Sequence, residues 1–194
     1  MKKRDVDIVI ALLENQEDQL NISQLSKKLN IDYKNTYNIV KRLEKENIIT
    51  LKRFGNAFDC ILNKKIIPLI FEAEYSRREE LLKNKNFRVL FNKLNSINIP
   101  FVALIFGSHA KKRATQYSDI DIMLIYNKNE NKNINIERTI SLLPLDIHPV
   151  TFSYSEFLKM ARSKEFTVVE EAIKNNIIFI GIEDYYRLIE NVKS

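Results

Sequence analysis

The sequence predicts an α+β protein with two domains, a small front domain of helices and a hairpin, and an α/β domain with a small mixed sheet. In the front part, apolar residues recur at helical spacing and are followed by two alternating strands around Gly55-Asn56. Behind it, short apolar runs alternate with helical stretches. The front part is also more basic: residues 1–66 hold 13 Lys plus Arg against 9 Asp plus Glu, and the remaining residues hold 18 against 16.

The length of 194 residues suits two small domains. We expect a front domain over residues 1–66, a helical linker over 67–86 and a second domain over 87–194. A single cysteine, Cys60, excludes an internal disulfide. The longest apolar runs are about a third of the ~20 residues that a membrane helix needs, and nothing resembles a signal peptide. We therefore expect a soluble, cytoplasmic protein without a membrane partner.

Three amphipathic helices precede the hairpin. Their inward-facing residues are Val6, Val9, Ile10, Leu12 and Leu13 in the first, Ile22, Leu25 and Leu29 in the second, and Tyr33, Tyr37, Val40 and Leu43 in the third. We expect the second helix to begin near Asn21 and Asp32 to be the N-cap of the third. With strands over residues 48–53 and 57–62, this order resembles the winged helix-turn-helix of MarR- or ArsR-type regulators.

That resemblance implies binding of duplex DNA. The third helix would present polar and basic residues to the major groove, and the wing would add two basic residues beside the backbone. The residues are Lys34, Asn35, Thr36, Asn38, Lys41 and Arg42 on the helix, and Lys52 and Arg53 on the wing. Winged helices commonly read two-fold sites as dimers, so a homodimer is compatible with this class. Docking or dimerisation with solvated charges is the open alternative.

The most informative stretch is Phe106 to Leu124, FGSHAKKRATQYSDIDIML. A Gly-Ser pair closes one apolar run, and ten residues later Asp119 and Asp121 stand two apart in another. Side chains alternate along a strand, so both carboxylates face the same way. At ~4 Å they repel by roughly 4 kcal/mol with an effective dielectric of ~20. Such a pair favours a cation, and Mg²⁺ suits carboxylates together with phosphates.

The Gly-Ser pair suits the phosphate end of the same site. Gly107 lets the backbone approach a ligand, and Ser108 opens a short helix whose free N–H groups favour an anion. Lys111, Lys112 and Arg113 either steady a triphosphate or solvate the helix, and Lys111 is favoured for the former. Gly-Ser pairs and lone Asp-x-Asp patterns also occur without function. Here, however, the aspartates interrupt an apolar strand, where unpaired charge is costly.

The pattern G-S-x10-D-x-D resembles the signature of the DNA polymerase β-type nucleotidyltransferase superfamily, in particular its minimal branch. The chain keeps Gly107, Ser108, Ala110, Ala114, Ser118, Asp119, Ile120 and Asp121 of the usual run, with Lys111 in place of an Arg. It departs at Lys112, where Gly is common, and we expect a helical Lys there to be sterically easy. The ending VEEAIKNNIIFI also resembles the tail of minimal nucleotidyltransferases.

The resemblance implies a third carboxylate on the next strand, and Asp146 in LDIHPV takes that role. Asp119 and Asp121 would hold two Mg²⁺ ions, while Asp146 would complete the catalytic metal site and accept the proton of the attacking hydroxyl. His148 shares the strand face of Asp146, and His109 follows the Gly-Ser pair. For both histidines a structural role is favoured, because the metal route needs no imidazole.

The remaining elements are expected as follows. Residues 68–97 are helical with a break at 84–86 and an apolar stripe of Leu90, Phe91, Leu94 and Ile97. Residues 126–135 form a polar loop, and Ser153 to Glu156 a capping box. Helices from Glu156 and Glu165, a strand over 177–180 and a helix from Glu183 complete the chain.

The expected activity is transfer of a nucleoside monophosphate, AMP from ATP or another NTP, to a hydroxyl. Because the sequence contains no evident acceptor-binding domain, the expected acceptor is a protein. The resemblance suggests a HEPN-type toxin as that acceptor, with this chain as its adenylylating antitoxin and the front domain repressing its own promoter. The alternative is a DNA-binding regulator whose rear domain only senses nucleotide.

Overall fold

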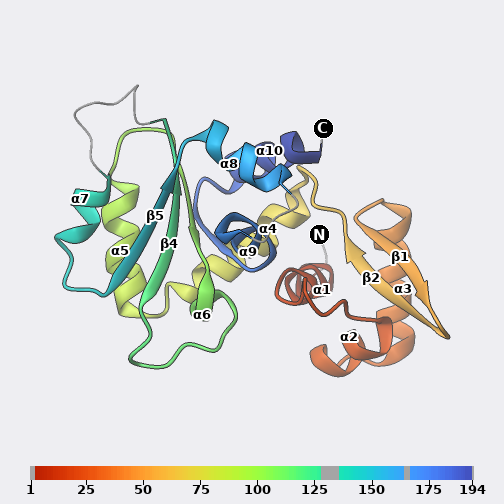
Figure 1. Ribbon diagram of the computed structural model, residues 1–194. Helices are drawn as coiled ribbons and strands as arrows, with labels where there is room; N and C mark the ends of the chain where they lie inside the picture. Colours follow the sequence, from red (N-terminus) through yellow and green to blue (C-terminus); the bar gives the residue numbers. More distant parts are fainter. Residues whose placement is uncertain (1–2, 128–135, 164–166, 194) are drawn as a thin grey trace. The chain divides into compact units, whose positions relative to one another are not determined.

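A computed structural model describes residues 3–127, 136–163 and 167–193, and the chain divides into two compact units (Figure 1). Unit 1 comprises Met1–Glu74 and unit 2 comprises Tyr75–Ser194. The boundary lies inside one helix, α4 (Pro68–Leu81). Among the described residues, no helix is both long and apolar enough to cross a lipid bilayer.

Unit 1 has the expected order of three helices and a hairpin. Its elements are α1 (Lys3–Leu13), α2 (Ile22–Leu29), α3 (Tyr33–Lys45), β1 (Ile49–Phe54) and β2 (Ala57–Leu62), followed by the first half of α4. The strands pair antiparallel, and Gly55 in the turn has a positive φ of 57°. The order agrees with the expectation, while its assignment to the winged-helix class stays a prediction.

Local capping residues set the bounds of α2 and α3. Asn21 and Gln24 form a reciprocal capping box at the start of α2. Asn30 ends that helix in the left-handed conformation with a φ of 49°, which asparagine tolerates better than most residues. The Asp32 carboxylate then accepts the backbone N–H of Asn35 at 3.0 Å. The predicted N-cap is therefore confirmed.

The predicted inner face of α3 is partly wrong. Val40 and Leu43 are fully buried, but Tyr33 and Tyr37 are 55% and 40% exposed and stack on each other at 6.3 Å between ring centroids. Thr36, expected to face outward, is fully buried instead, and its hydroxyl donates to the Asp32 carbonyl. Residues 36, 40 and 43 follow i, i+4, i+7 spacing, so this stripe, without the tyrosines, is the core face.

Unit 2 is built around a four-stranded mixed sheet of order β5-β4-β3-β6. Strands β4 and β5 run parallel, while β3 pairs antiparallel with β4 and with β6. In chain order the elements are α5 (Lys85–Asn95), β3 (Val102–Ile105), α6 (Gly107–Ala110), β4 (Ile120–Ile125), α7 (Ile136–Ser141), β5 (Ile147–Phe152), α8 (Tyr154–Arg162), α9 (Val168–Lys174), β6 (Ile177–Ile180) and α10 (Ile182–Lys193).

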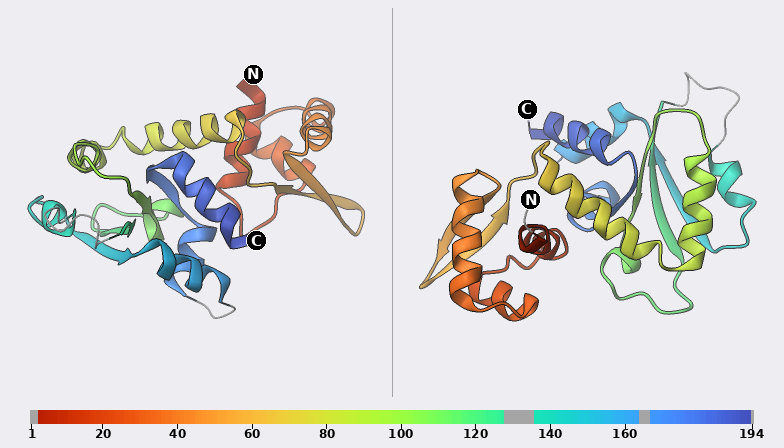
Figure 2. Two further views of the ribbon diagram at one scale, coloured as in Figure 1. Left: turned by 90° about the horizontal axis from the view of Figure 1, so that it is seen from above. Right: turned by 180° about the vertical axis from the view of Figure 1, so that it is seen from behind.

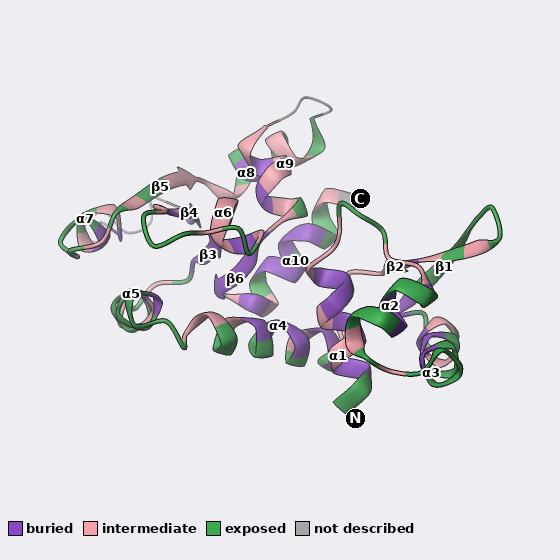
Figure 3. Cartoon of the chain, turned by 90° about the horizontal axis from the view of Figure 1, so that it is seen from below, coloured by how far each residue is buried: buried purple, intermediate pink, exposed green. Residues whose placement is uncertain are grey.

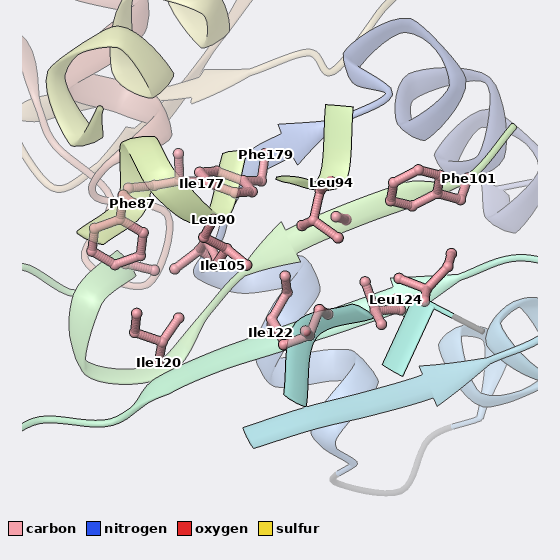
Figure 4. Packing of buried hydrophobic residues seen from close by; sticks show 14 of the residues in the cluster. Phe87, Leu90, Leu94, Phe101, Ile105, Ile120, Ile122, Leu124, Ile177 and Phe179 are labelled. Atoms are coloured by element: carbon pink, nitrogen blue, oxygen red, sulfur yellow. The ribbon is translucent and has the colours of Figure 1, made fainter. Parts of the chain in front are cut away.

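Helices cover both faces of this sheet (Figure 2). Alternate residues of β3, β4 and β6 pack against α5 and α7, and Figure 4 shows Leu90 and Leu94 of α5 among them. Ile120, Ile122 and Leu124 of β4 belong to this core. Because strand residues alternate, Asp121 lies on the opposite face from these three, which is the face toward α8, α9 and α10.

Several expected boundaries are found in unit 2. The break between α4 and α5 lies where expected, with Asn84 as N-cap of α5. Ser153 and Glu156 form the predicted capping box of α8, which begins at Tyr154. Of the predicted polar loop, residues 128–135 lie outside the described residues. Glu165 also lies outside them, and α9 begins at Val168 rather than there.

Candidate metal and nucleotide site

The end of β3 meets the start of β4 at Gly107, where an added side chain would clash with Asp121 and the backbone is left-handed. Phe106 is extended, its N–H donates to the Asp121 carbonyl at 3.1 Å, and Gly107 then turns the chain with a positive φ of 64°. A Cβ at Gly107 would lie 2.1 Å from Oδ2 of Asp121. The glycine therefore permits both the left-handed turn and the close approach of the carboxylate.

Asp119, Asp121 and His148 form one cluster of candidate ligands. One ligand atom from each lies within 4.8 Å of the others. Nδ1 of His148 is 2.7 Å from Oδ2 of Asp119. The parallel register places Asp121 opposite His148, so the cluster spans β4 and β5. The predicted aspartates are thus together, joined by a histidine for which the sequence favoured a structural role.

Electrostatics in the cluster favour a bound cation. Burial, and then the neighbouring charge of Asp119, raise the pKa of the Asp121 carboxyl above its usual value. The nearby imidazole of His148 opposes this shift, whereas Glu171 of α9 adds to it. Repulsion between the two aspartates is relieved when a cation lies between them. Two carboxylates and an imidazole are a donor set that divalent cations accept, so these residues fit a divalent metal ion of some kind.

Asp146 lies one residue before β5 rather than inside the strand. Its carbonyl accepts the N–H of Ile120 at 2.8 Å, which aligns the starts of β4 and β5. The carboxylate is 78% exposed and approaches His148, with 3.6 Å between its Oδ1 and Nε2 of the ring. Asp146 therefore borders the three-residue cluster through His148, and its catalytic role stays a prediction.

Helix α6 begins at Gly107, next to Asp121, and carries two buried polar atoms. The Oγ of Ser108 is buried and has no hydrogen-bond partner among the described residues, and the same holds for Nε2 of His109. The His109 ring packs edge-on against Phe87 at 5.0 Å, which agrees with its expected structural role. A buried hydroxyl without a partner is costly, so Ser108 is suited to contact a ligand such as a phosphate oxygen.

Lys111 is paired in this structure. Its Nζ lies 2.9 Å from Oε1 of Glu171 on α9, and both side chains are partly buried. Lys112 corrects an expectation, because it is not helical but has a positive φ of 54°. Glycine adopts this left-handed backbone conformation most easily, which explains why the nucleotidyltransferase signature commonly has a glycine at this position. The sequence did not indicate Glu171, since 60 residues separate it from Lys111.

Comparison with models of protein families matches residues 71–183 to "Polymerase beta, Nucleotidyltransferase". This match covers more than half of the chain and includes every member of the cluster. The chain belongs to the polymerase beta nucleotidyltransferase family. No match was found among curated proteins, and none among solved structures.

Membership of the nucleotidyltransferase family confirms the main functional prediction in its general form, nucleotidyl transfer with an NTP as substrate and a divalent metal. The matched region begins inside α4, so nearly all of unit 1 lies outside it. The family match therefore bears on the site in unit 2, and the activity of unit 1 remains a prediction.

The predicted DNA-contacting residues of unit 1 divide into two groups. Lys34, Asn38 and Lys41 are exposed on α3, and Lys52 and Arg53 are exposed on β1. Figure 3 shows exposed stretches on both elements. Arg42 instead forms an ion pair with the largely buried Asp5 of α1, and the Asn35 amide donates to the carboxylate of Asp32. Lys41 pairs with Glu44 on its own helix.

Proposed function

We propose that this protein transfers a nucleoside monophosphate, AMP from ATP, to a hydroxyl of a protein acceptor with the help of Mg²⁺. The single observation that supports this most strongly is the contact of the Gly107 turn with Asp121. It joins a phosphate-binding turn to a carboxylate pair in one site inside the family match. A nucleotide can then contact metal and helix N–H groups at the same time.

Each residue has a defined part in this proposal. Gly107 and Ser108 bind the triphosphate through backbone N–H groups and the unpartnered hydroxyl. Lys111, held beside the site by Glu171, faces the charge that develops on the leaving pyrophosphate. Asp119 and Asp121 hold the divalent ions, which when bound stabilise the charge of the transferred phosphoryl group. Asp146, exposed at the rim, accepts the proton of the acceptor hydroxyl.

The openness of the site favours a macromolecular acceptor. His148 and Asp146 are 60% and 78% exposed, so the catalytic edge of the sheet is accessible to a large partner. A HEPN-type toxin, modified by this protein as its antitoxin, is the acceptor that we propose.

A radiolabel experiment tests the activity. The protein is incubated with each α-labelled NTP, Mg²⁺ and lysate or candidate acceptor, and transfer to a protein band is measured. We expect label from ATP with the wild type and none with Asp119→Asn/Asp121→Asn.

A binding experiment tests the site itself. Circular dichroism first checks that the double variant is folded, and isothermal calorimetry should then show that it has lost Mg²⁺-dependent ATP affinity. Equal metal-dependent affinity in wild type and double variant would overturn the site, and metal-dependent binding without transfer would support the nucleotide-sensing regulator instead.

A single substitution separates chemistry from binding. If Asp146 is the base, Asp146→Asn should lower kcat strongly while ATP affinity changes little, because only the transition state loses an interaction. Single-turnover kinetics with the identified acceptor measure this split. Transfer by Asp146→Asn at near the wild-type rate would show that another group accepts the proton.

We also propose that unit 1 binds duplex DNA and that this binding represses the promoter of the chain's own gene. The exposed basic residues of α3 and β1 support this, since these elements belong to a helix-helix-helix-hairpin order that is typical of DNA-binding domains. Affinity for duplex DNA should fall steeply with salt, with a log–log slope near −0.9 for each phosphate neutralised. Binding without salt dependence, or no binding to promoter or generic duplex, would leave unit 1 a docking module.

A further inference from the structure

The third position of the cluster is occupied by an imidazole, where the sequence assigned a carboxylate. His148 of β5 lies opposite Asp121 of β4 in the parallel register, and its Nδ1 faces the Asp119 carboxylate at 2.7 Å. The Asp146 carboxylate is on the far side of the ring, nearer Nε2. The order across the site is thus aspartate pair, imidazole, then exposed carboxylate.

We infer that His148 is itself a ligand of the metal, so that two carboxylates and one imidazole bind the ion and favour Mn²⁺ over Mg²⁺. This inference rests on the proposed metal-dependent function and goes beyond it by naming the third ligand and the preferred ion. Imidazole is a good ligand for transition metals, whereas Mg²⁺ prefers oxygen ligands and water. The identity of the third ligand therefore sets the selectivity of the centre.

The distances suit direct coordination. Ligand atoms about 2.1 Å from one octahedral ion lie roughly 3 Å apart when they are adjacent in its shell and about 4 Å apart when opposite. The 2.7 Å between Nδ1 of His148 and Oδ2 of Asp119 is close to the first value. The full cluster, within 4.8 Å, closes around one ion after small side-chain shifts.

Asp146 then has a positioning role toward His148 in addition to its proposed part as base. Ligating histidines commonly present their second ring nitrogen to a carboxylate, which fixes the tautomer and the ring orientation. The 3.6 Å between Nε2 of His148 and Oδ1 of Asp146 is just beyond hydrogen-bond distance, so a small side-chain shift would bring a carboxylate into that position. On this arrangement, removal of the Asp146 charge weakens metal binding less than removal of the His148 ring does.

The test uses full-length protein with Mn²⁺ and inorganic triphosphate, a probe that contains no nitrogen. Pulsed electron paramagnetic resonance of the bound Mn²⁺ should show the nitrogen coupling of a directly bound imidazole. The chain has only two histidines, so two variants assign the signal. His148→Asp should keep a bound ion and lose the imidazole coupling, while the matched control His109→Gln should retain it.

Calorimetry with the same probe measures selectivity. His148→Ala should weaken Mn²⁺ binding by about 10–100-fold. Losses of that size already follow the substitution of residues that only hydrogen-bond to a metal ligand. His148→Asp should lower the ratio of Mn²⁺ to Mg²⁺ affinity by roughly tenfold, because a carboxylate replaces the imidazole. Asp146→Asn should keep the nitrogen coupling and lose less Mn²⁺ affinity than His148→Ala.

The outcomes separate this inference from the proposed function. Wild-type protein that binds Mn²⁺ without imidazole coupling, or coupling that persists in His148→Asp, would overturn the inference. Loss of bound Mn²⁺ in Asp146→Asn with none in His148→Ala would restore the ligand set of three carboxylates and leave nucleotidyl transfer standing. Wild-type protein that binds neither metal in the presence of triphosphate would overturn both proposals.

Discussion

At the scale of single residues, the site contains polar groups whose burial is unfavourable in the absence of a ligand. Asp121 is partly buried beside Asp119, and Ser108 has a buried hydroxyl without a partner among the described residues. Each of these features costs folding free energy and is relieved by a cation or a phosphate. Residues selected for binding can therefore lower the stability of the unliganded protein.

Asp121→Asn should stabilise the metal-free protein at neutral pH while weakening metal binding. The folded-state pKa of Asp121 is raised, by burial first and by Asp119 second, above an unfolded value of about 3.9. The folded protein thus holds this proton more tightly, and the associated stability is lost as the pH rises through the folded pKa. We expect the melting temperature of the variant to exceed that of wild type at pH 7 and to approach it near pH 4. A variant that melts below wild type at pH 7 in chelator would contradict this.

Gly107→Ala should abolish metal-dependent ATP binding, and Gly55→Ala should not. Both glycines have positive φ, but a Cβ at Gly107 would strike the Asp121 carboxylate at 2.1 Å, whereas a Cβ at Gly55 meets nothing within 4 Å. Backbone strain of about 1–2 kcal/mol is common to both variants. Urea unfolding and calorimetry separate the shared loss of stability from the specific loss of ligand. Retained ATP affinity in Gly107→Ala would show that the turn and Asp121 are not coupled.

At the scale of elements, α3 serves both the core of unit 1 and its exposed surface. Thr36, Val40 and Leu43 form the buried stripe, and Lys34, Asn38 and Lys41 are exposed. Arg42 belongs to the fold as well, because its guanidinium pairs with the largely buried Asp5. A substitution on this helix can therefore act on folding or on DNA, depending on the residue.

Arg42→Ala should destabilise unit 1, while Lys41→Ala should leave its stability nearly unchanged. The first substitution leaves the buried Asp5 carboxylate without its ion-pair partner, at a cost on the order of 1–3 kcal/mol. The second removes an exposed pair with Glu44, and exposed pairs contribute little. Chemical denaturation measures the stability of both variants. In a separate experiment, DNA affinity is measured against salt concentration, and the log–log slope should be flatter by about one unit in Lys34→Ala and in Lys41→Ala. Equal stability of the Arg42 and Lys41 variants would contradict the prediction.

At the scale of the whole molecule, the two units separate the proposed activities along the chain. The candidate metal site lies in unit 2, and the exposed basic residues of α3 and β1 lie in unit 1. Each unit has buried apolar residues from its own elements. We therefore expect each unit to unfold as a separate cooperative body.

Cys60 offers a probe for that expectation. Cys60 is 3% exposed on β2 in unit 1, and burial raises the pKa of its thiol to about 12, so the thiol should react with a maleimide only when unit 1 opens. ATP with divalent metal should raise the melting temperature of unit 2 by linkage and leave the labelling rate of Cys60 unchanged. Labelling that slows markedly with ATP and metal in wild type, but not in Asp119→Asn/Asp121→Asn, would show that the units unfold together.

Spacing along the chain was enough to predict the parts of the site that are local. Gly107, Ser108, Asp119 and Asp121 belong to one strand-turn-strand segment, where alternation and glycine geometry follow from sequence position alone. The caps at Asp32 and Ser153 were predictable for the same reason, because a cap binds a backbone N–H only three residues away. The strand over residues 177–180 was predicted with the bounds that the structure shows.

Contacts between distant segments required the tertiary structure. The parallel register of β4 and β5 places His148 opposite Asp121, and packing of α9 brings Glu171 to Lys111. Arg42 meets Asp5 across 37 residues for the same kind of reason. Sequence periodicity states which face of an element a side chain occupies. It does not state which element lies against that face, because strand register and helix packing depend on the summed burial of many residues.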